Sequence, residues 1–418
     1  MPYSINQEPP SVMHIDLNSA FATTEQQAHP SLRGRPIGVT NRISKHCCVI
    51  AASYEAKALG IQVGMRLSDA RDIAPDFVIL ESDPPKYHHM YQKIAAIMKS
   101  YSPHVKMKSI DEGVIDFKGT LDHINTRPLI DIGHEIKKRV RQELGSWMRV
   151  NIGIGPNQFL AKQAAGWHKP DGLDMLDHTN LVNYYKSIEL MDITGIAERF
   201  ATRLNAAGIY TPLQFLEATS ETLRRQVFHS IIGEDWHARL RGYEVDNKET
   251  KLGVVGRQWV LKKPSNNPNF ILPCFQYLCE TTGKKLRFNN VDARGVLVWA
   301  RFINGESFVL RKMFKSSFYT DQEIYRRALY LFNQRPKHMI IQTMGITCYM
   351  LTPSQRSQLS IFESQNREEW LTEAIDELNE RYGNFIIHAA SSLEGKKIVK
   401  QKIPFGGTKY FDLLLKRT

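Results

Sequence analysis

Three carboxylates stand where neighbouring strands of one sheet could bring them together. Asp16 lies in an apolar stretch, residues 13–17, that predicts a short buried strand, and Asp111 and Glu112 lie at the turn between two further strands. If these strands are neighbours, the three acids gather at one edge of the sheet, where they cannot all ionise cheaply without a cation. Carboxylate oxygens suit Mg²⁺ or Mn²⁺, and a carboxylate pair that bridges two such ions supports in-line phosphoryl or nucleotidyl transfer. The competing interpretation is an ordinary solvated turn at Asp111, Glu112 and the following glycine.

The elements around these acids predict a sheet of the required kind. Periodic apolar residues predict helices over 88–101 and 129–144 and a further helix from about Asn157. Alternating residues predict a hairpin over 104–117 and a strand over 149–154. The order of strand, helix, strand pair, helix and strand resembles a split βαβ, or ferredoxin-like, sheet with an insertion after its first strand.

The rest of the chain predicts further domains, so the fold class is α+β and multidomain. Residues 180–243 are expected to be all-helical, and residues 244–252 lack apolar periodicity and are expected to form a linker. Residues 253–352 show the pattern of a second, smaller α/β unit.

Charge is unevenly spread along the 418 residues. The chain holds 55 Lys and Arg against 43 Asp and Glu, a formal net charge of +12. Residues 253–352 hold 15 Lys and Arg against 5 acids, a net +10, whereas residues 363–381 hold 2 Arg against 7 acids, a net −5. A basic segment is often only a solvated surface, but a concentration of this size also fits a surface that binds nucleic acid.

Membrane and disulfide classes are disfavoured by the composition. No stretch approaches the ~18 consecutive apolar residues that a membrane helix needs, and the polar N-terminus lacks a basic-then-apolar signal. The five cysteines include no C-x-x-C pair. We therefore expect a cytoplasmic protein that does not associate with membranes.

Four motifs resemble those of one enzyme family. Residues 16–22 (DLNSAFA) resemble the D-x-[DN]-x-F-[FY]-A motif of Y-family (translesion) DNA polymerases, and residues 109–112 (SIDE) resemble their S-[IL]-D-E motif. Residues 52–60 resemble the fingers motif A-x-Y-x-A-R-x-x-G, and residues 151–173 are similar to the segment G-I-[GA]-x-[NT]-K-x-L-A-K-x-A…K-P-x-G, with Gln158 in place of its first lysine. The motifs occur in family order, so the chain is identified as a member of the Y-family, of bacterial type.

The resemblance implies a right-hand polymerase with a ferredoxin-like palm, small fingers, a helical thumb and an α/β little finger. The implied limits are a palm at 1–27 and 85–179, fingers at 28–84, a thumb with a helix-hairpin-helix at 180–243, a linker at 244–252, a little finger that binds DNA at 253–352 and a C-terminal tail at 353–418.

The resemblance also implies roles in a two-metal active site. Asp16 and Asp111 would bridge two Mg²⁺ ions, Glu112 would hold the ion on the primer side, and the carbonyl of Leu17 would be a backbone ligand. Asn18 stands where many relatives carry Asp, which is not expected to inactivate the site.

Four more residues match the positions that contact the nucleotide in the family. Phe21 falls at the steric gate that favours dNTP over rNTP, and Tyr54, Lys57 and Lys169 match positions that contact the triphosphate. Lys57 replaces the usual Arg and loses its bidentate fork, which predicts weaker nucleotide binding. The alternatives are a core Phe, a packing Tyr and solvated Lys residues.

Contacts to DNA and to a partner protein are implied further along the chain. The turn at Gly195, Ile196 and Ala197 resembles a helix-hairpin-helix that holds a DNA phosphate, although the usual second glycine is Ala197, and an ordinary helical hairpin is the alternative. Arg257 in the basic unit is expected to contact DNA. The segment 358–362 resembles the peptide that binds the bacterial sliding clamp; its matching residues are Gln358, Leu359, Ile361 and Phe362.

The predicted function is template-directed addition of dNTPs to a primer 3′-OH, with low fidelity and bypass of damaged template bases. The expected partners are primer–template DNA, dNTP and the bacterial sliding clamp, and the expected state is a monomer. A non-catalytic relative that binds DNA and clamp is the runner-up, but such relatives lack the three acids. A nucleotidyl cyclase also uses acids on a ferredoxin-like sheet, but it needs neither a basic domain nor a clamp peptide.

Overall fold

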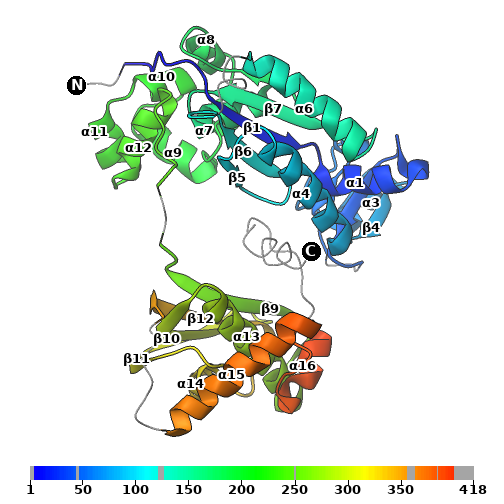
Figure 1. Ribbon diagram of the computed structural model, residues 1–418, viewed down its shortest axis with the longest axis vertical. Helices are drawn as coiled ribbons and strands as arrows, with labels where there is room; N and C mark the ends of the chain where they lie inside the picture. The colour runs from blue at the N-terminus through cyan, green and yellow to red at the C-terminus, as the bar shows by residue number, and fades with distance from the viewer. Residues whose placement is uncertain are drawn as a thin grey trace. The chain divides into compact units, whose positions relative to one another are not determined.

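The computed structural model describes residues 4–43, 47–120, 127–248, 251–354, 363–383 and 385–399. These residues form two compact units that divide between Lys248 and Glu249, and each unit is described by itself (Figure 1). Within the described residues, no helix is long and apolar enough to cross a membrane.

The first unit is built on a five-stranded sheet with the order β5-β6-β1-β7-β8. Its strands are β1 (Val12–Leu17), β5 (Val105–Met107), β6 (Glu112–Asp116), β7 (Val150–Gly155) and β8 (Leu173–Met175). The first four pair antiparallel, and β8 joins β7 in parallel. Leaving β8 aside, this is the strand order of the ferredoxin-like split βαβ, so the predicted topology is confirmed.

Alternation along β1 decides which side chains reach each face of this sheet. Met13, Ile15 and Leu17 belong to the main apolar core, which α4 (Pro84–Lys99) and α6 (Leu129–Glu143) cover. The other residues of β1 face α7 (Gln158–Trp167). A Cβ atom on Gly153 would lie 2.0 Å from the carbonyl oxygen of Ala161, so this glycine lets α7 approach the sheet closely.

A small subdomain is inserted after α1 (Ala20–Ala28) and the short η1 (Pro30–Leu32). Its three-stranded sheet has the order β3-β2-β4, formed by β3 (Ala51–Ala52), β2 (Ile37–Thr40) and β4 (Val78–Glu81). The helices α2 (Tyr54–Ala58) and α3 (Leu67–Ile73) complete it around a small separate core.

Short helices follow β8 and share a core with α7. They are α8 (Leu181–Lys186), η2 (Leu190–Asp192), α9 (Glu198–Ala206), α10 (Pro212–Glu217), α11 (Ser220–Thr222), η3 (Leu223–Val227) and α12 (Ile232–Leu240). Phe215, Phe228 and Trp236 form an aromatic cluster among these helices, and Phe159 of α7 packs edge-on against Trp236. The all-helical prediction for this stretch is confirmed.

The second unit is a four-stranded antiparallel sheet with the order β11-β10-β12-β9. Along the chain its elements are β9 (Val254–Ser265), α13 (Pro268–Phe288), β10 (Val291–Phe302), β11 (Ser307–Phe318), α14 (Asp321–Phe332) and β12 (Ile341–Pro353). The prediction of a second, smaller α/β unit in residues 253–352 is confirmed. Both helices lie on one face of the sheet, and among the described residues no helix covers the other face, which is called the open face (Figure 1).

Three C-terminal elements add to the helical side of the second unit. They are α15 (Glu363–Tyr382), η4 (Ala390–Ser392) and α16 (Leu393–Ile398). Buried Arg287 of α13 forms ion pairs with Asp376 of α15 at 2.5 Å and with Asp321 at 2.7 Å. Phe385 packs edge-on against Tyr277. The acidic segment is therefore packed against α13 rather than separate from the basic unit.

Candidate active site

The pairing of β1 with β6 brings the three predicted acids together. Asp16 of β1 lies directly opposite Glu112 of β6, so their side chains share the sheet face that α7 covers. Asp111 precedes β6, and its carbonyl accepts a hydrogen bond from the backbone N–H of Leu17 at 2.9 Å. The convergence of these acids at one edge was expected from the sequence, and the strand register produces it.

Two lysines flank this cluster. The ammonium of Lys169 lies 2.6 Å from Oδ2 of Asp16, and that of Lys162 on α7 lies 2.8 Å from Oε2 of Glu112. His14, which is only 2% exposed, places Nε2 3.4 Å from the same Glu112 oxygen. Sequence reasoning did not select Lys162 or His14. The signal for His14 was its position two residues before Asp16 on the same face of one strand.

The acids differ in their pKa. Burial raises the pKa of Asp111, against the hydrogen bond from Ser109, and the charges of Asp16 and Glu112 raise it further. For Glu112, burial alone would raise the pKa, but the contacts with His14 and Lys162 outweigh burial and lower it to about 2. Glu112 is thus held as a carboxylate, whereas a nearby cation would stabilise the ionised form of Asp111.

The donor set suits a divalent metal ion. One ligand atom each of His14, Asp16 and Glu112 lies within 4.8 Å of the others. Two carboxylates with a nearby third acid match the preference of Mg²⁺ for oxygen ligands. The imidazole of His14 is a ligand that Mn²⁺ also accepts.

Beside the acids, three predicted nucleotide contacts converge. Lys57 lies over the ring of Tyr54, with Nζ 4.7 Å from its centroid, and donates a hydrogen bond to Ser19 at 2.8 Å. Partial burial and then the positive charge of Lys169 lower the pKa of Lys57. Two cations and one hydroxyl, gathered from distant segments, form a surface that suits a polyanion.

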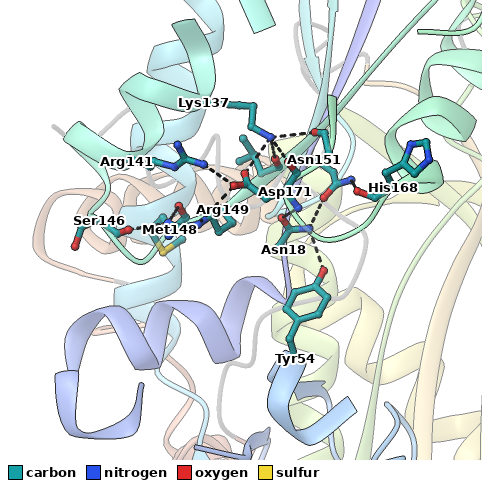
Figure 2. Close-up of polar contacts among 12 residues, drawn as sticks. Asn18, Tyr54, Lys137, Arg141, Ser146, Met148, Arg149, Asn151, His168 and Asp171 are labelled. Atoms are coloured by element: carbon teal, nitrogen blue, oxygen red, sulfur yellow. Dashed lines mark hydrogen bonds and ion pairs between the residues drawn. The ribbon is translucent and has the colours of Figure 1, made fainter. Parts of the chain in front are cut away.

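A buried hydrogen-bond network connects Tyr54 with the loop that carries Lys169. Figure 2 shows Asn18 at its centre, between Tyr54 and Asn151, with Asp171 and His168 on the loop side. Ion pairs with α6 also hold this loop, because Asp171 pairs with Lys137 at 3.0 Å and with Arg141 at 2.5 Å. The sequence analysis noted Asn18 but not the network.

Phe21 lies on α1 next to the acids and is 7% exposed. Its ring stacks on Tyr87 of α4, with centroids 4.3 Å apart and an angle of 16° between the planes. The ring is therefore held in a fixed orientation. Its assignment as the steric gate stays a prediction.

The predicted DNA contacts in the helical region lie at the start of α9. Gly195 has a φ of +95°, Ile196 is buried, and Ala197 is the N-cap of α9 without a side-chain hydrogen bond. The side chain of Ala197 therefore accepts no hydrogen bond from the first backbone N–H groups of α9. A phosphate contact at this turn stays a prediction.

Arg257 has surroundings that differ from those of an exposed DNA contact. It lies opposite Ile346, which is buried under the helices, and its charge lowers the pKa of Lys285 on α13, after the larger effect of burial. Its side chain therefore lies on the helical side of the sheet. By the same alternation, exposed Arg301 and Arg311 project from the open face. The predicted clamp peptide, residues 358–362, lies outside the described residues.

Comparisons with known proteins identify the family of the chain. Residues 15–166 match the impB/mucB/samB family, and residues 255–361 match the C-terminal domain of the same family. The chain is 30% identical over 398 residues to the DNA polymerase IV of Moorella thermoacetica, which covers 93% of this chain and 98% of that protein. It is 25% identical over 392 residues to the DNA polymerase IV 1 of Bacillus subtilis, which covers 92% and 93%.

Solved structures share the fold. A Y-family DNA polymerase chimera built on Dbh superposes with a TM-score of 0.68 at 22% identity, covering 81% of this chain and 98% of the chimera. The insertion ternary complex of Dbh DNA polymerase gives a TM-score of 0.56 at 23% identity, with the same coverage. These likenesses support the right-hand polymerase architecture.

Proposed function

The chain belongs to the impB/mucB/samB family of Y-family DNA polymerases, and we propose that it is a DNA-directed DNA polymerase for translesion synthesis. The observation that carries the proposal is the convergence of Asp16, Asp111 and Glu112 on adjacent strand ends beside Lys57 and Lys169. The reaction is attack of the primer 3′-hydroxyl on the α-phosphorus of a dNTP, with pyrophosphate as the leaving group.

The three acids and the carbonyl of Leu17 would hold two divalent cations, which we propose to be Mg²⁺. When bound, such ions lower the pKa of the attacking hydroxyl and neutralise charge on the phosphates. Glu112 is already ionised and anchored through Oε2, so its second oxygen is available to a ligand. Lys169, which pairs with Asp16 in the structure, would bind the triphosphate beside the site that holds the cations.

The remaining predicted contacts fit the same reaction. Tyr54 and Lys57 would bind triphosphate oxygens, and Phe21, fixed by Tyr87, would lie against the sugar and exclude a 2′-hydroxyl. The small subdomain of residues 28–84 corresponds to the fingers, and its size supports low fidelity and bypass of damaged bases. The other proposed domains are a palm at 1–27 and 85–179, a thumb at 180–243 and a little finger at 253–352.

Primer extension on undamaged and abasic templates tests the proposal. Asp111→Ala and Glu112→Gln should each reduce extension by about a thousandfold or more, because each removes a carboxylate that would hold a divalent cation at the reacting phosphate, while binding of primer–template DNA is largely retained. Glu143→Gln, which changes an exposed acid of α6, is the matched control. Extension by either site variant at the control rate would contradict the site assignment.

We propose further that residues 358–362 bind the bacterial sliding clamp and that the polymerase acts as a monomer in the cytoplasm. The support is the peptide pattern, with Leu359 and Phe362 as the apolar anchors, and its place directly after the basic unit. Replacing both anchors with Ala should abolish the stimulation of synthesis by the clamp while synthesis without the clamp continues. Undiminished stimulation would contradict the peptide assignment.

A further inference from the structure

Asn18 connects two nucleotide-binding segments that are far apart in the sequence. Its Nδ2 donates to the hydroxyl of Tyr54 at 3.0 Å and to Oδ1 of Asn151 at 2.8 Å, and its Oδ1 accepts from the backbone N–H of Asp171 at 3.0 Å (Figure 2). Asn18 is 2% exposed and Asn151 is fully buried. Both N–H donors of Asn18 and its carbonyl oxygen are thus used inside the protein.

Two backbone groups of the loop fix the direction of every hydrogen bond in this network. The N–H of Asp171 can only donate, so Asn18 must present its oxygen there and its NH₂ group on the other side. The carbonyl of His168 can only accept, so Asn151 presents its NH₂ group to it, at 3.2 Å, and its oxygen to Asn18. Reversing either amide would face like groups toward each other.

The consequence concerns the hydroxyl proton of Tyr54. Because Asn18 donates to the Tyr54 oxygen, that bond does not use the Tyr54 proton, and the proton is free to point elsewhere. Ser19 also lowers the pKa of Tyr54, which is the effect of a donor to the oxygen, although burial raises that pKa overall. The neighbouring Lys57 and Lys169 have no acceptor lone pairs but attract anions, so a phosphate oxygen bound between them would be an acceptor for this proton.

We propose that Asn18 is a positioning residue for the incoming nucleotide. Its amide makes Tyr54 a hydrogen-bond donor to the triphosphate and fixes the position of Tyr54 relative to the loop that carries Lys169. This inference rests on the proposed polymerase function. A carboxylate at position 18 would accept the Tyr54 proton and withdraw it from the nucleotide. It would also face Oδ1 of Asn151, which cannot turn to donate without losing its bond to His168.

The test measures the dissociation constant of the correct dNTP on a dideoxy-terminated primer–template, together with KM and kcat for extension. Asn18→Asp should weaken dNTP binding by about tenfold or more, as expected for a lost hydrogen bond to a charged group, and should act mainly on KM. Tyr54→Phe, which removes one hydroxyl and leaves the ring, should weaken binding to a similar extent. Asn205→Asp, an exposed position on α9, adds the same charge away from the site and is the matched control.

The double variant separates positioning from a general structural role. In the Tyr54→Phe background, Asn18→Asp should cost clearly less than it does beside Tyr54, because the hydroxyl through which Asn18 acts is gone. Equal losses in both backgrounds, or unchanged binding in Tyr54→Phe, would overturn the inference. If the wild-type protein itself does not extend a primer, that result would instead contradict the proposed polymerase function.

Discussion

Glu112 and Asp111 are adjacent in the chain, yet the structure gives them opposite electrostatic surroundings. Glu112 is held ionised between Lys162 and His14, whereas Asp111 is half-buried beside two other acids with Ser109 as its donor. Glu112 is therefore ionised without a metal ion, whereas a bound cation would stabilise the ionised form of Asp111. The asymmetry arises because strand alternation directs Glu112 toward α7.

The fixed ring of Phe21 leads to a prediction at the same scale. Phe21→Leu should raise ribonucleotide incorporation relative to deoxyribonucleotide incorporation by about tenfold or more, because the smaller side chain no longer fills the space of a 2′-hydroxyl. Leu is preferred to Ala because truncating a buried Phe to Ala costs about 3–5 kcal/mol of stability. Single-nucleotide incorporation with matched rNTP and dNTP measures the ratio.

Tyr87→Phe is the control for that experiment. It keeps the stacked ring and removes only the hydroxyl that bonds to Glu25 at 2.7 Å. Its sugar selectivity should equal that of the wild type. If Phe21→Leu also leaves selectivity unchanged, the gate lies elsewhere.

At the scale of elements, the contact between α13 and the C-terminal segment buries an acid that forms no ion pair with any residue the structure describes. Glu280 of α13 is 4% exposed and accepts a hydrogen bond from Ser392 of η4 at 2.9 Å. Burial raises its pKa to about 7, and Asp321 adds to this effect, while the bond from Ser392 opposes it. The packing of η4 on α13 is therefore sensitive to pH.

The sign of this sensitivity follows from linkage. Because the pKa of Glu280 is higher in the folded protein than its ordinary value of 4.5, folding is favoured at low pH, and this contribution is lost as the pH rises through about 7. Glu280→Gln should therefore match the wild type below about pH 4.5 and be more stable above pH 7, by on the order of 1–3 kcal/mol. Hydrogen exchange of α13 amides at pH 5 and pH 8 gives the local stability.

Glu373→Gln, at an exposed position of α15, is the matched control and should show no such pH-dependent gain. A Glu280→Gln protein that is less stable than the wild type at pH 8 would show that the carboxylate is stabilised by its surroundings instead.

At the scale of the whole molecule, charge separates the two faces of the second unit. The open face of its sheet presents exposed Arg301 and Arg311, whereas the helical side carries the acidic helix α15. Residues 253–352 carry a net charge of +10 over both faces, and the segment of −5 packs only on the helical side. An anionic duplex would therefore be attracted more strongly to the open face than to the helical side.

This separation predicts the salt dependence of DNA binding. Arg301→Ala and Arg311→Ala should each weaken binding at low salt and reduce the slope of log K against log[salt] by about 0.9, the value for one lost phosphate contact. Arg326→Ala, an exposed arginine of α14 on the helical side, is the matched control and should leave the slope unchanged. Titrations of a labelled primer–template at several salt concentrations measure the slopes. An equal change in all three variants would indicate a general charge effect.

The sequence by itself determined the chemistry and the order of elements. The types and spacing of Asp16, Asp111 and Glu112, the alternation of β1 and the apolar period of the helices are local properties, and each is read from a few neighbouring residues. The split βαβ topology and the second α/β unit followed from that order, because few connections are compatible with it.

Only the tertiary structure decided which distant groups act on these residues. The pairing of Lys162 and His14 with Glu112, the link from Asn18 to Tyr54 and Asp171, and the packing of the acidic helix against Arg287 join segments far apart in the chain. Such contacts depend on strand register and helix packing, which set side-chain positions to within an ångström or two. No local pattern contains that information. The sequence therefore identified the acidic residues of the site, and the fold determined which charged and polar groups surround them.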